Sequence, residues 1–149
     1  MKTHLFRKEQ FVQVPRGRVF EFFSRPENLA RLTPPELGFV VLTPSPIEMK
    51  HGALIDYTVR LMGIRLRWTT LITAYDPPDR FVDEQLKGPY SFWHHTHTFS
   101  EVDGGTIITD EVKYAMPFGP AGNLVHALFV RRNLQKIFRY RAKHVEEKL

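Results

Sequence analysis

The segment from Ala121 to Leu149 restricts the fold most strongly, because its pattern predicts one long helix with a single apolar side. It contains no proline, and Gly122 is its only glycine. Its apolar residues recur with the 3.6-residue period of an α-helix and fall in one wide stripe. These residues are Leu124, Ala127, Val130, Leu134, Ile137, Phe138, Val145 and Leu149. A helix of this kind needs another element to cover its stripe.

The other side of this helix accounts for the positive charge of the chain. The formal net charge is +5, and the residues from Pro120 onward contain seven Lys and Arg against Glu146 and Glu147. We interpret this excess as a solvated helix face, although a basic surface could also contact nucleic acid or an anionic membrane. Arg141 is an exception, because it falls in the apolar stripe, where it needs a buried partner or must extend outward.

The rest of the chain shows mainly the alternating pattern of β-strands. Strands are predicted at residues 4–14, 37–42, 53–61, 64–74, 81–86, 91–101 and 106–116. Two short helices follow the first strand, and we expect Pro15 in the first turn of one and Ser24 to cap the other. The order is strand, two helices, six strands and a long helix. This order predicts one α+β domain of two layers over residues 1–149.

Several classes of protein are excluded by what the chain lacks. Without cysteine it can form no disulfide and offers no thiolate. No segment approaches the roughly 18 apolar residues of a membrane span, and the N-terminus shows no apolar signal core. Neither a Gly-rich phosphate loop nor a nucleophile elbow is present. We therefore expect a cytoplasmic protein, a monomer or homodimer, with no cofactor, no nucleic-acid partner and no stable membrane insertion.

The turn at Met62 and Gly63 shows which side chains of the first long hairpin face inward. With a two-residue loop, Val59 opposes Leu66 and Tyr57 opposes Trp68. Alternate residues share one face of a strand, so these side chains lie together. The opposite face carries charged and hydroxyl side chains, and we therefore place Tyr57 and Trp68 on the inner face.

The turn at residues 102–105 places polar groups on the same inner face. Here Trp93 opposes Tyr114, His95 opposes Val112, and His97 opposes Asp110. Buried polar groups are costly unless they are hydrogen-bonded, so this cluster indicates a wet or ligand-filled interior.

The preceding strand also brings a carboxylate to this region, but its register is ambiguous. A loop over residues 87–90 turns Glu84 inward, opposite Trp93. A slip of one residue turns Asp83 and Gln85 inward instead.

Three interpretations of this polar cluster remain open. His97 and Asp110 could act as a general base and its orienting carboxylate, or they could form a structural pair. His95 and His97 could join Asp110 or Glu84 in a metal site, but two histidines at alternate strand positions are weak evidence, and we assign no metal. The third interpretation is a ligand site that includes the aromatic side chains. The candidate ligand-binding residues are Tyr57, Trp68, Glu84, Trp93, His95, His97, Asp110 and Tyr114.

The order of these patterns resembles the START, polyketide-cyclase and birch-pollen-allergen-like superfamily, whose domains have the helix-grip fold. The resemblance rests on Val14-Pro15, on residues 19–23 and on Pro26-Glu27-Asn28-Leu29. It continues through residues 80–85, 88–90 and 93–99, which are similar to a bacterial branch of the superfamily.

The resemblance implies a curved antiparallel sheet of about seven strands around the long helix, with a cavity between them for a small hydrophobic or aromatic molecule. It implies a carrier or sensor, or alternatively a cyclase or dehydratase, for which the His97 and Asp110 pair predicted from the register would be the candidate catalytic residues. No catalytic residues are carried over, since the superfamily has no uniform catalytic set and a fold does not determine a function.

Overall fold

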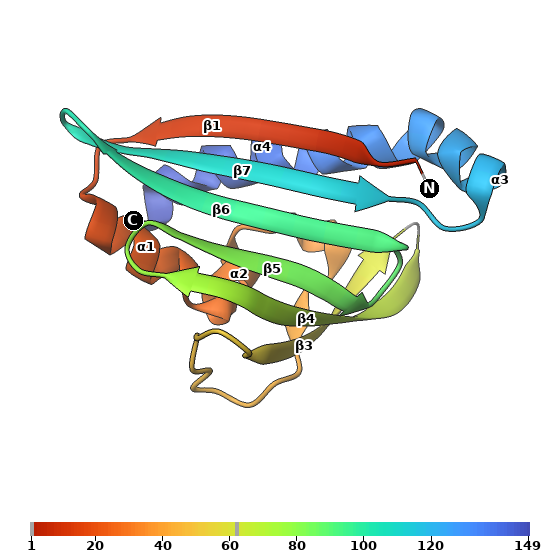
Figure 1. Cartoon of the computed structure of the whole chain (residues 1–149), viewed down its shortest axis with the longest axis horizontal. Helices are drawn as coiled ribbons and strands as arrows, with labels where there is room; N and C mark the ends of the chain where they lie inside the picture. The colour runs from red at the N-terminus through yellow and green to blue at the C-terminus, as the bar shows by residue number, and fades with distance from the viewer. Residues whose placement is uncertain (1, 62) are drawn as a thin grey trace.

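The computed structural model describes residues 2–61 and 63–149, and its largest element is one antiparallel sheet of seven strands. The strands are β1 (His4–Val12), β2 (Val40–Val41), β3 (Leu54–Leu61), β4 (Ile64–Asp76), β5 (Arg80–Lys87), β6 (Phe92–Val102) and β7 (Gly105–Ala115). Their order across the sheet is β1-β7-β6-β5-β4-β3-β2. The sheet is strongly curved, and its concave side faces the helices (Figure 1).

The helices lie on the inner side of the sheet and close it at one end. Two short helices, α1 (Arg16–Phe23) and α2 (Pro26–Arg31), follow β1, and the C-terminal helical segments run behind β1, β7 and β6 (Figure 1). The end of the chain reaches α1, where Arg18 donates a hydrogen bond to the carbonyl of Leu149 at 3.1 Å. This arrangement confirms the predicted helix-grip architecture. Within the described residues, no helix combines the length and the apolar character that a membrane span requires.

The C-terminal helix consists of three consecutive segments, and this corrects part of the predicted stripe. They are α3 (Gly119–Val125), the π-helical segment η2 (His126–Val130) and α4 (Arg131–Lys148). Leu134, Phe138 and Val145 are buried as predicted. Leu124 is 61% exposed and Ala127 is also exposed, so their predicted inward orientation is wrong. A π-turn holds one residue more than an α-turn, so the two α-helical segments do not share one continuous 3.6-residue pattern.

Two predictions near the short helices are also corrected by local backbone geometry. Ser24 ends α1, and the residue preceding the first turn of α2 is Arg25, because Pro26 disfavours a helical conformation in the residue before it. The strand predicted at residues 37–42 is reduced to β2. It is preceded by a short 3-10 helix, η1 (Pro35–Leu37), which ends at Gly38 with φ +51°, a left-handed conformation that interrupts an extended chain.

The strand registers predicted from the two hairpin turns are confirmed. Tyr57 pairs with Trp68 and Val59 with Leu66 between β3 and β4. Across β6 and β7, His95 pairs with Val112 and His97 with Asp110. Met62, which was assigned to the first turn, lies outside the described residues. Because the side chains of a strand alternate between its two faces, these registers turn the predicted aromatic and polar side chains toward the helices.

The apolar interior has two main parts. In the part beside α1, which we call the filled half, fully or almost fully buried residues pack together: Val12, Val19, Phe20, Leu32, Phe81, Phe99, Ile108 and Val145. The part between β3, β4, β6 and α4, which we call the cavity half, contains Val59, Trp68, Trp93, Val112, Tyr114, Leu134 and Phe138. The candidate site lies in the cavity half.

Candidate functional site: a cavity with a histidine-carboxylate wall

A cavity of about 170 Å³ lies between the concave face of the sheet and α4. Most of its wall is apolar. The strands β3 and β4 contribute Tyr57, Val59, Trp68 and others, and α4 contributes Leu134, Ile137 and Phe138. Phe23, Leu29 and Phe39, from α1, α2 and the segment before β2, complete this part of the wall. The side chains of the short N-terminal elements therefore limit the size of the cavity.

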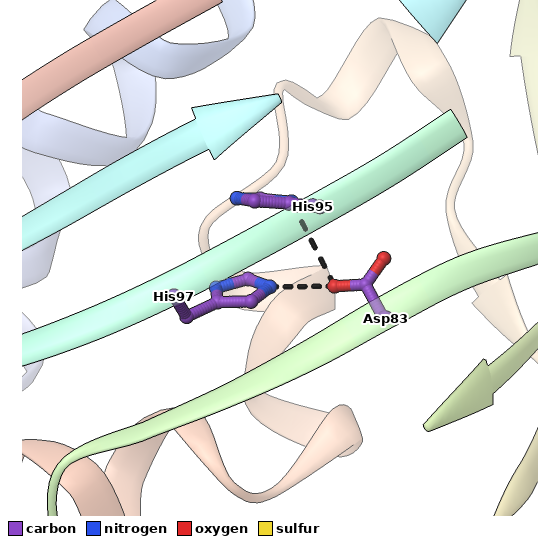
Figure 2. Close-up of side chains that lie close together, drawn as sticks. All are labelled: Asp83, His95 and His97. Atoms are coloured by element: carbon purple, nitrogen blue, oxygen red, sulfur yellow. Dashed lines mark hydrogen bonds and ion pairs between the residues drawn. The ribbon is translucent and has the colours of Figure 1, made fainter. Parts of the chain in front are cut away.

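One wall of the cavity is polar and comes from β5 and β6. Asp83, His95 and His97 project from these neighbouring strands toward one another (Figure 2). The Nε2 atom of His97 lies 2.5 Å from Oδ2 of Asp83, and the Nε2 atom of His95 lies 2.8 Å from Oδ1 of Asp110. The remaining ring nitrogens are farther away: Nδ1 of His95 is 3.7 Å from Asp83, and Nδ1 of His97 is 3.5 Å from Asp110. Each histidine therefore lies between two carboxylates.

Aromatic stacking fixes the orientation of the two histidines. Their ring centroids are 3.7 Å apart, with 24° between the ring planes. Phe81 stacks on the other face of His97 at 4.1 Å. The ring of Phe138 meets His95 edge-on at 5.7 Å, so α4 also contacts this stack. The filled half thus supports the polar wall through Phe81, which belongs to both regions.

The carboxylates of this wall are ionised at neutral pH. Burial alone would raise the pKa of Asp110, but its hydrogen bond from His95 and the nearby positive charges outweigh burial and lower the pKa to about 2. Burial likewise opposes ionisation of Asp83, yet the neighbouring His95 and the hydrogen bond from His97 lower its pKa. An ionised carboxylate can only accept hydrogen bonds, so Nε2 of each histidine must be the donor.

The pKa of His97 is lowered, whereas a carboxylate beside an exposed imidazole would raise the pKa of that imidazole. Burial lowers its pKa, and the neighbouring His95 lowers it further, while Asp83 and Asp110 only partly compensate. His97 is therefore a neutral imidazole at pH 7, with its proton on the Nε2 that faces Asp83. Its unprotonated Nδ1 faces Asp110 at 3.5 Å.

The structure brings most of the predicted site residues to the cavity, with three exceptions. Tyr57, Trp68, Trp93, His95 and His97 line the cavity as expected. Among the described residues, Glu84, Asp110 and Tyr114 do not form its wall. These three residues are described below.

Asp110 lies behind His95 and holds it from the side of β7, so the predicted hydrogen-bonded pair of His97 and Asp110 is replaced by His95–Asp110 and His97–Asp83. Tyr114 is buried away from the cavity, where its hydroxyl lies 2.7 Å from Nε2 of His126.

The inward placement of Glu84 is wrong, and the alternative register is the observed one. Glu84 pairs with His94, and Asp83 pairs with His95. The reason lies in the loop after β5. Gln85 donates a hydrogen bond to the carbonyl of Tyr90 at 2.7 Å and accepts one from the Tyr90 amide at 3.1 Å. This side chain closes a loop one residue longer than alternation alone indicated.

Most of the residues that line the cavity were not among the predicted site residues, and three of them bear on its polar character. Asp83 follows from the corrected register, and Tyr90 follows from the longer loop. Arg141 also lines the cavity, and its position in the apolar stripe of the helix was the signal that could have identified it. Its guanidinium carbon lies 4.8 Å above the ring of Phe138.

A metal ion fits this wall poorly, although it contains a suitable set of ligand types. Ligand atoms of Asp83, His95 and His97 all lie within 4.8 Å of one another, and two histidines with one carboxylate can bind several transition metals. A metal ion must lie close to the plane of each imidazole that binds it. Two rings stacked 3.7 Å apart and only 24° from parallel direct their lone pairs along separate planes. Binding of one ion by both rings would require one ring to leave the stack.

Comparisons with known proteins agree with this architecture. A sheet that curves around a C-terminal helix and leaves a cavity between them defines the helix-grip class. The family described as "Polyketide cyclase / dehydrase and lipid transport" matches residues 3–149. The chain belongs to this family. A search of curated proteins found no match to the sequence.

Solved structures show the same fold at low sequence identity. TTHA0849 from Thermus thermophilus is 19% identical and has a TM-score of 0.77, with 97% of this chain and 95% of that chain covered. Ara h 8.0201 is 20% identical with a TM-score of 0.64, covering 97% and 98% of the two chains. The di-domain ARO/CYC BexL is 18% identical with a TM-score of 0.73, covering 97% of this chain and 49% of BexL. At these identities the likeness concerns the fold alone.

Proposed function

We propose that this protein binds a small, flat, largely apolar molecule in the cavity and acts as its carrier or sensor. The observation that carries the proposal is a hollow of about 170 Å³ whose wall is mainly aromatic and aliphatic, next to a closely packed cluster of buried side chains. Empty space of this size forfeits packing contacts that a ligand would restore.

The size of the cavity favours a ligand of one or two rings. A cavity of roughly 150 Å³ in another protein holds benzene, so a hollow slightly larger suits a compact ring system better than a long acyl chain. Tyr57 and Trp68 stack with 18° between their planes and offer a flat apolar surface on one side. Phe138 faces the cavity from α4.

Binding without chemistry agrees better with the polar wall than catalysis does. A general base needs an unprotonated nitrogen that reaches the substrate. Both ring nitrogens of His95 and of His97 face Asp83 or Asp110 at 3.7 Å or less. The histidines therefore serve to keep the two buried carboxylates paired, and the wall presents a fixed polar edge to a ligand.

Tryptophan fluorescence offers a direct test, because the chain contains only two tryptophans and both line the cavity. We expect a bicyclic aromatic probe such as naphthalene to change the emission in a saturable manner. The Trp68→Phe and Trp93→Phe variants should each keep part of the response. If calorimetry shows no binding of naphthalene or smaller aromatic probes, and emission does not change, the proposal is wrong.

A second candidate is a cyclase or dehydratase, the activity named first in the family description. One observation favours it: neutral His97 lies at the cavity wall, hydrogen-bonded to ionised Asp83, which is an arrangement that can accept a proton once the ring turns. This candidate is tested by measuring how fast the α-hydrogens of an enolisable cyclic ketone exchange for deuterium in D₂O, because that exchange requires a base to remove them. If the His97→Gln variant, with binding retained, exchanges as fast as the unchanged protein, His97 is not the base.

A further inference from the structure

Arg141 of α4 enters the cavity without a partner for its Nε atom. This atom is buried, and no hydrogen bond to it is found among residues 2–61 and 63–149. The guanidinium packs over Phe138, and it is close enough to Asp83 and Asp110 to lower the pKa of both. Among the described residues, however, the ion-pair partners of both carboxylates are His95 and His97 rather than Arg141.

Trp68 provides a second buried hydrogen-bond donor that lacks an acceptor in the described part of the chain. Nε1 of Trp68 is buried without a hydrogen-bond partner among the described residues, and Trp68 lines the cavity from β4. A buried donor without an acceptor loses its hydration and gains nothing in return, so such groups are uncommon in folded proteins. Arg141 and Trp68 both line the same hollow, so one molecule in that hollow can supply the missing acceptors once a small shift of each side chain opens the buried nitrogen to it.

The charges around Arg141 restrict the kind of acceptor. Asp83 and Asp110 are ionised and His97 is neutral, so two negative charges already lie near Arg141 on this side of the cavity. A ligand carboxylate would add a further negative charge beside Asp83. A ketone, ester or quinone oxygen accepts a hydrogen bond from Arg141 without this repulsion.

We propose that the ligand is a neutral ring compound with a carbonyl oxygen that accepts a hydrogen bond from Nε of Arg141, while a second oxygen, where present, faces Nε1 of Trp68. This inference rests on the proposed function, since it specifies the ligand of the same cavity. It makes Arg141 the residue that selects oxygenated ligands over hydrocarbons. The apolar wall supplies affinity for the rings, and Arg141 supplies the preference for oxygen.

Three compounds with the same bicyclic skeleton test the proposal: tetralin, 1-tetralone and the anion 1,2,3,4-tetrahydronaphthalene-1-carboxylate. Isothermal titration calorimetry with the full chain should show 1-tetralone binding about tenfold more tightly than tetralin, the effect of one hydrogen bond to a charged donor. The carboxylate should bind more weakly than 1-tetralone. Arg141→Met should lower the affinity for 1-tetralone about tenfold and change the affinity for tetralin less than about twofold.

Arg139→Met is the matched control, because Arg139 is exposed on the same helix and does not line the cavity. It should change none of the three affinities. If tetralin binds and 1-tetralone binds no more tightly, or if Arg141→Met weakens both equally, the inference is overturned and the proposed function stands. If none of the three binds, the proposed function fails as well. Should Arg141→Met not fold, the ranking of the three compounds on the unchanged protein still decides.

Discussion

The filled half and the cavity half are built from the same sheet and closed by helices, yet one is packed solid and the other is hollow and partly polar. In the filled half, Phe20 meets Phe81 and Phe99 edge-on at 5.9 and 5.3 Å. In the cavity half, Trp68 and Trp93 meet edge-on at 5.1 Å, but a hollow of about 170 Å³ remains beside them. Aromatic content is therefore similar in the two halves and does not explain the difference.

The two halves differ in the side chains that the helices direct into them. The helix α1 inserts Val19 and Phe20 into the filled half, and both are almost completely buried. In the cavity half, α4 contributes the charged side chain of Arg141 to the wall, whereas Val145 of the same helix packs in the filled half. A partly filled interior costs stability, so we expect the filled half to contribute most to stability and the cavity half to retain the freedom to bind.

The largest expected effect is that of removing a ring from the filled half. Phe99 is 1% exposed, and Phe99→Ala should lower the free energy of unfolding by about 4 kcal/mol. Phe118 is 86% exposed, and the same change there should cost less than about 0.5 kcal/mol. Urea unfolding measures both. Equal costs would show that the filled half is not the main source of stability.

Acid should weaken the fold through the polar wall of the cavity half. The folded-state pKa of Asp110 is about 2, below the ordinary value of 3.8, so the unfolded chain binds a proton first as the pH falls. This carboxylate contributes about 2 kcal/mol above pH 4, which is lost between pH 4 and pH 2. The lowered pKa of Asp83 acts in the same direction.

His97 causes a further loss of stability, which begins at a higher pH than the loss caused by the carboxylates. The pKa of His97 is lowered by burial, so the unfolded state gains a proton first as the pH falls below 6.5, and the stabilisation present at higher pH declines. Urea unfolding at pH 8, 6, 4 and 3 should show both losses. In Asp110→Asn, the steep loss below pH 4 should be reduced. A stability that does not change between pH 8 and 3 would contradict the ionised wall.

The smallest expected effect comes from one added methylene in each half. Val19 is fully buried in the filled half, and Val19→Leu should lower stability by about 1.5 kcal/mol through overpacking. Val59 lines the cavity, where Val59→Leu can extend into empty space. It should change stability by less than about 1 kcal/mol and weaken binding of naphthalene. Calorimetric titration and thermal unfolding of both variants check this contrast. A Val59→Leu variant that binds naphthalene normally would place the ligand elsewhere.

Much of the fold was predictable because short turns and alternation act together. Once Met62 and Gly63 are assigned to a turn, every pair from Leu61–Ile64 to Tyr57–Trp68 follows. The same reasoning placed His95 and His97 on the inner face. The register between β5 and β6 could not be predicted in this way, because it depends on a side chain. The hydrogen bonds of Gln85 to Tyr90 set the register that turns Asp83 inward.

The details of the candidate site needed the third dimension. The hydrogen-bond partner of His97 is Asp83 of β5 rather than Asp110 of β7. The two strands flank β6, and the oxygen of Asp83 lies closer to the ring of His97 than that of Asp110, although Asp110 is the residue paired with His97 in the sheet. The sequence identified Arg141 as unusual, but only the packing of α4 against the sheet shows that it faces a hollow. The cavity itself could not be predicted, because its volume is the space left between packed side chains, and a pattern of residue types does not give that space.

The π-helical segment η2 means that the length of the C-terminal helix, and not only its composition, determines which residues face the sheet. Within η2, His126 is buried, and its ring stacks on His4 of β1 at 3.6 Å. A π-turn accommodates one residue more than an α-turn, so a chain shortened by one residue at exposed Ala127 could form a regular α-helix there and leave α3 facing the sheet as it does now. A residue deleted within α4 has no such extra residue to replace it, and the helix before the deletion would turn by about 100° relative to the part after it. A single deletion should therefore be tolerated better within η2 than within α4.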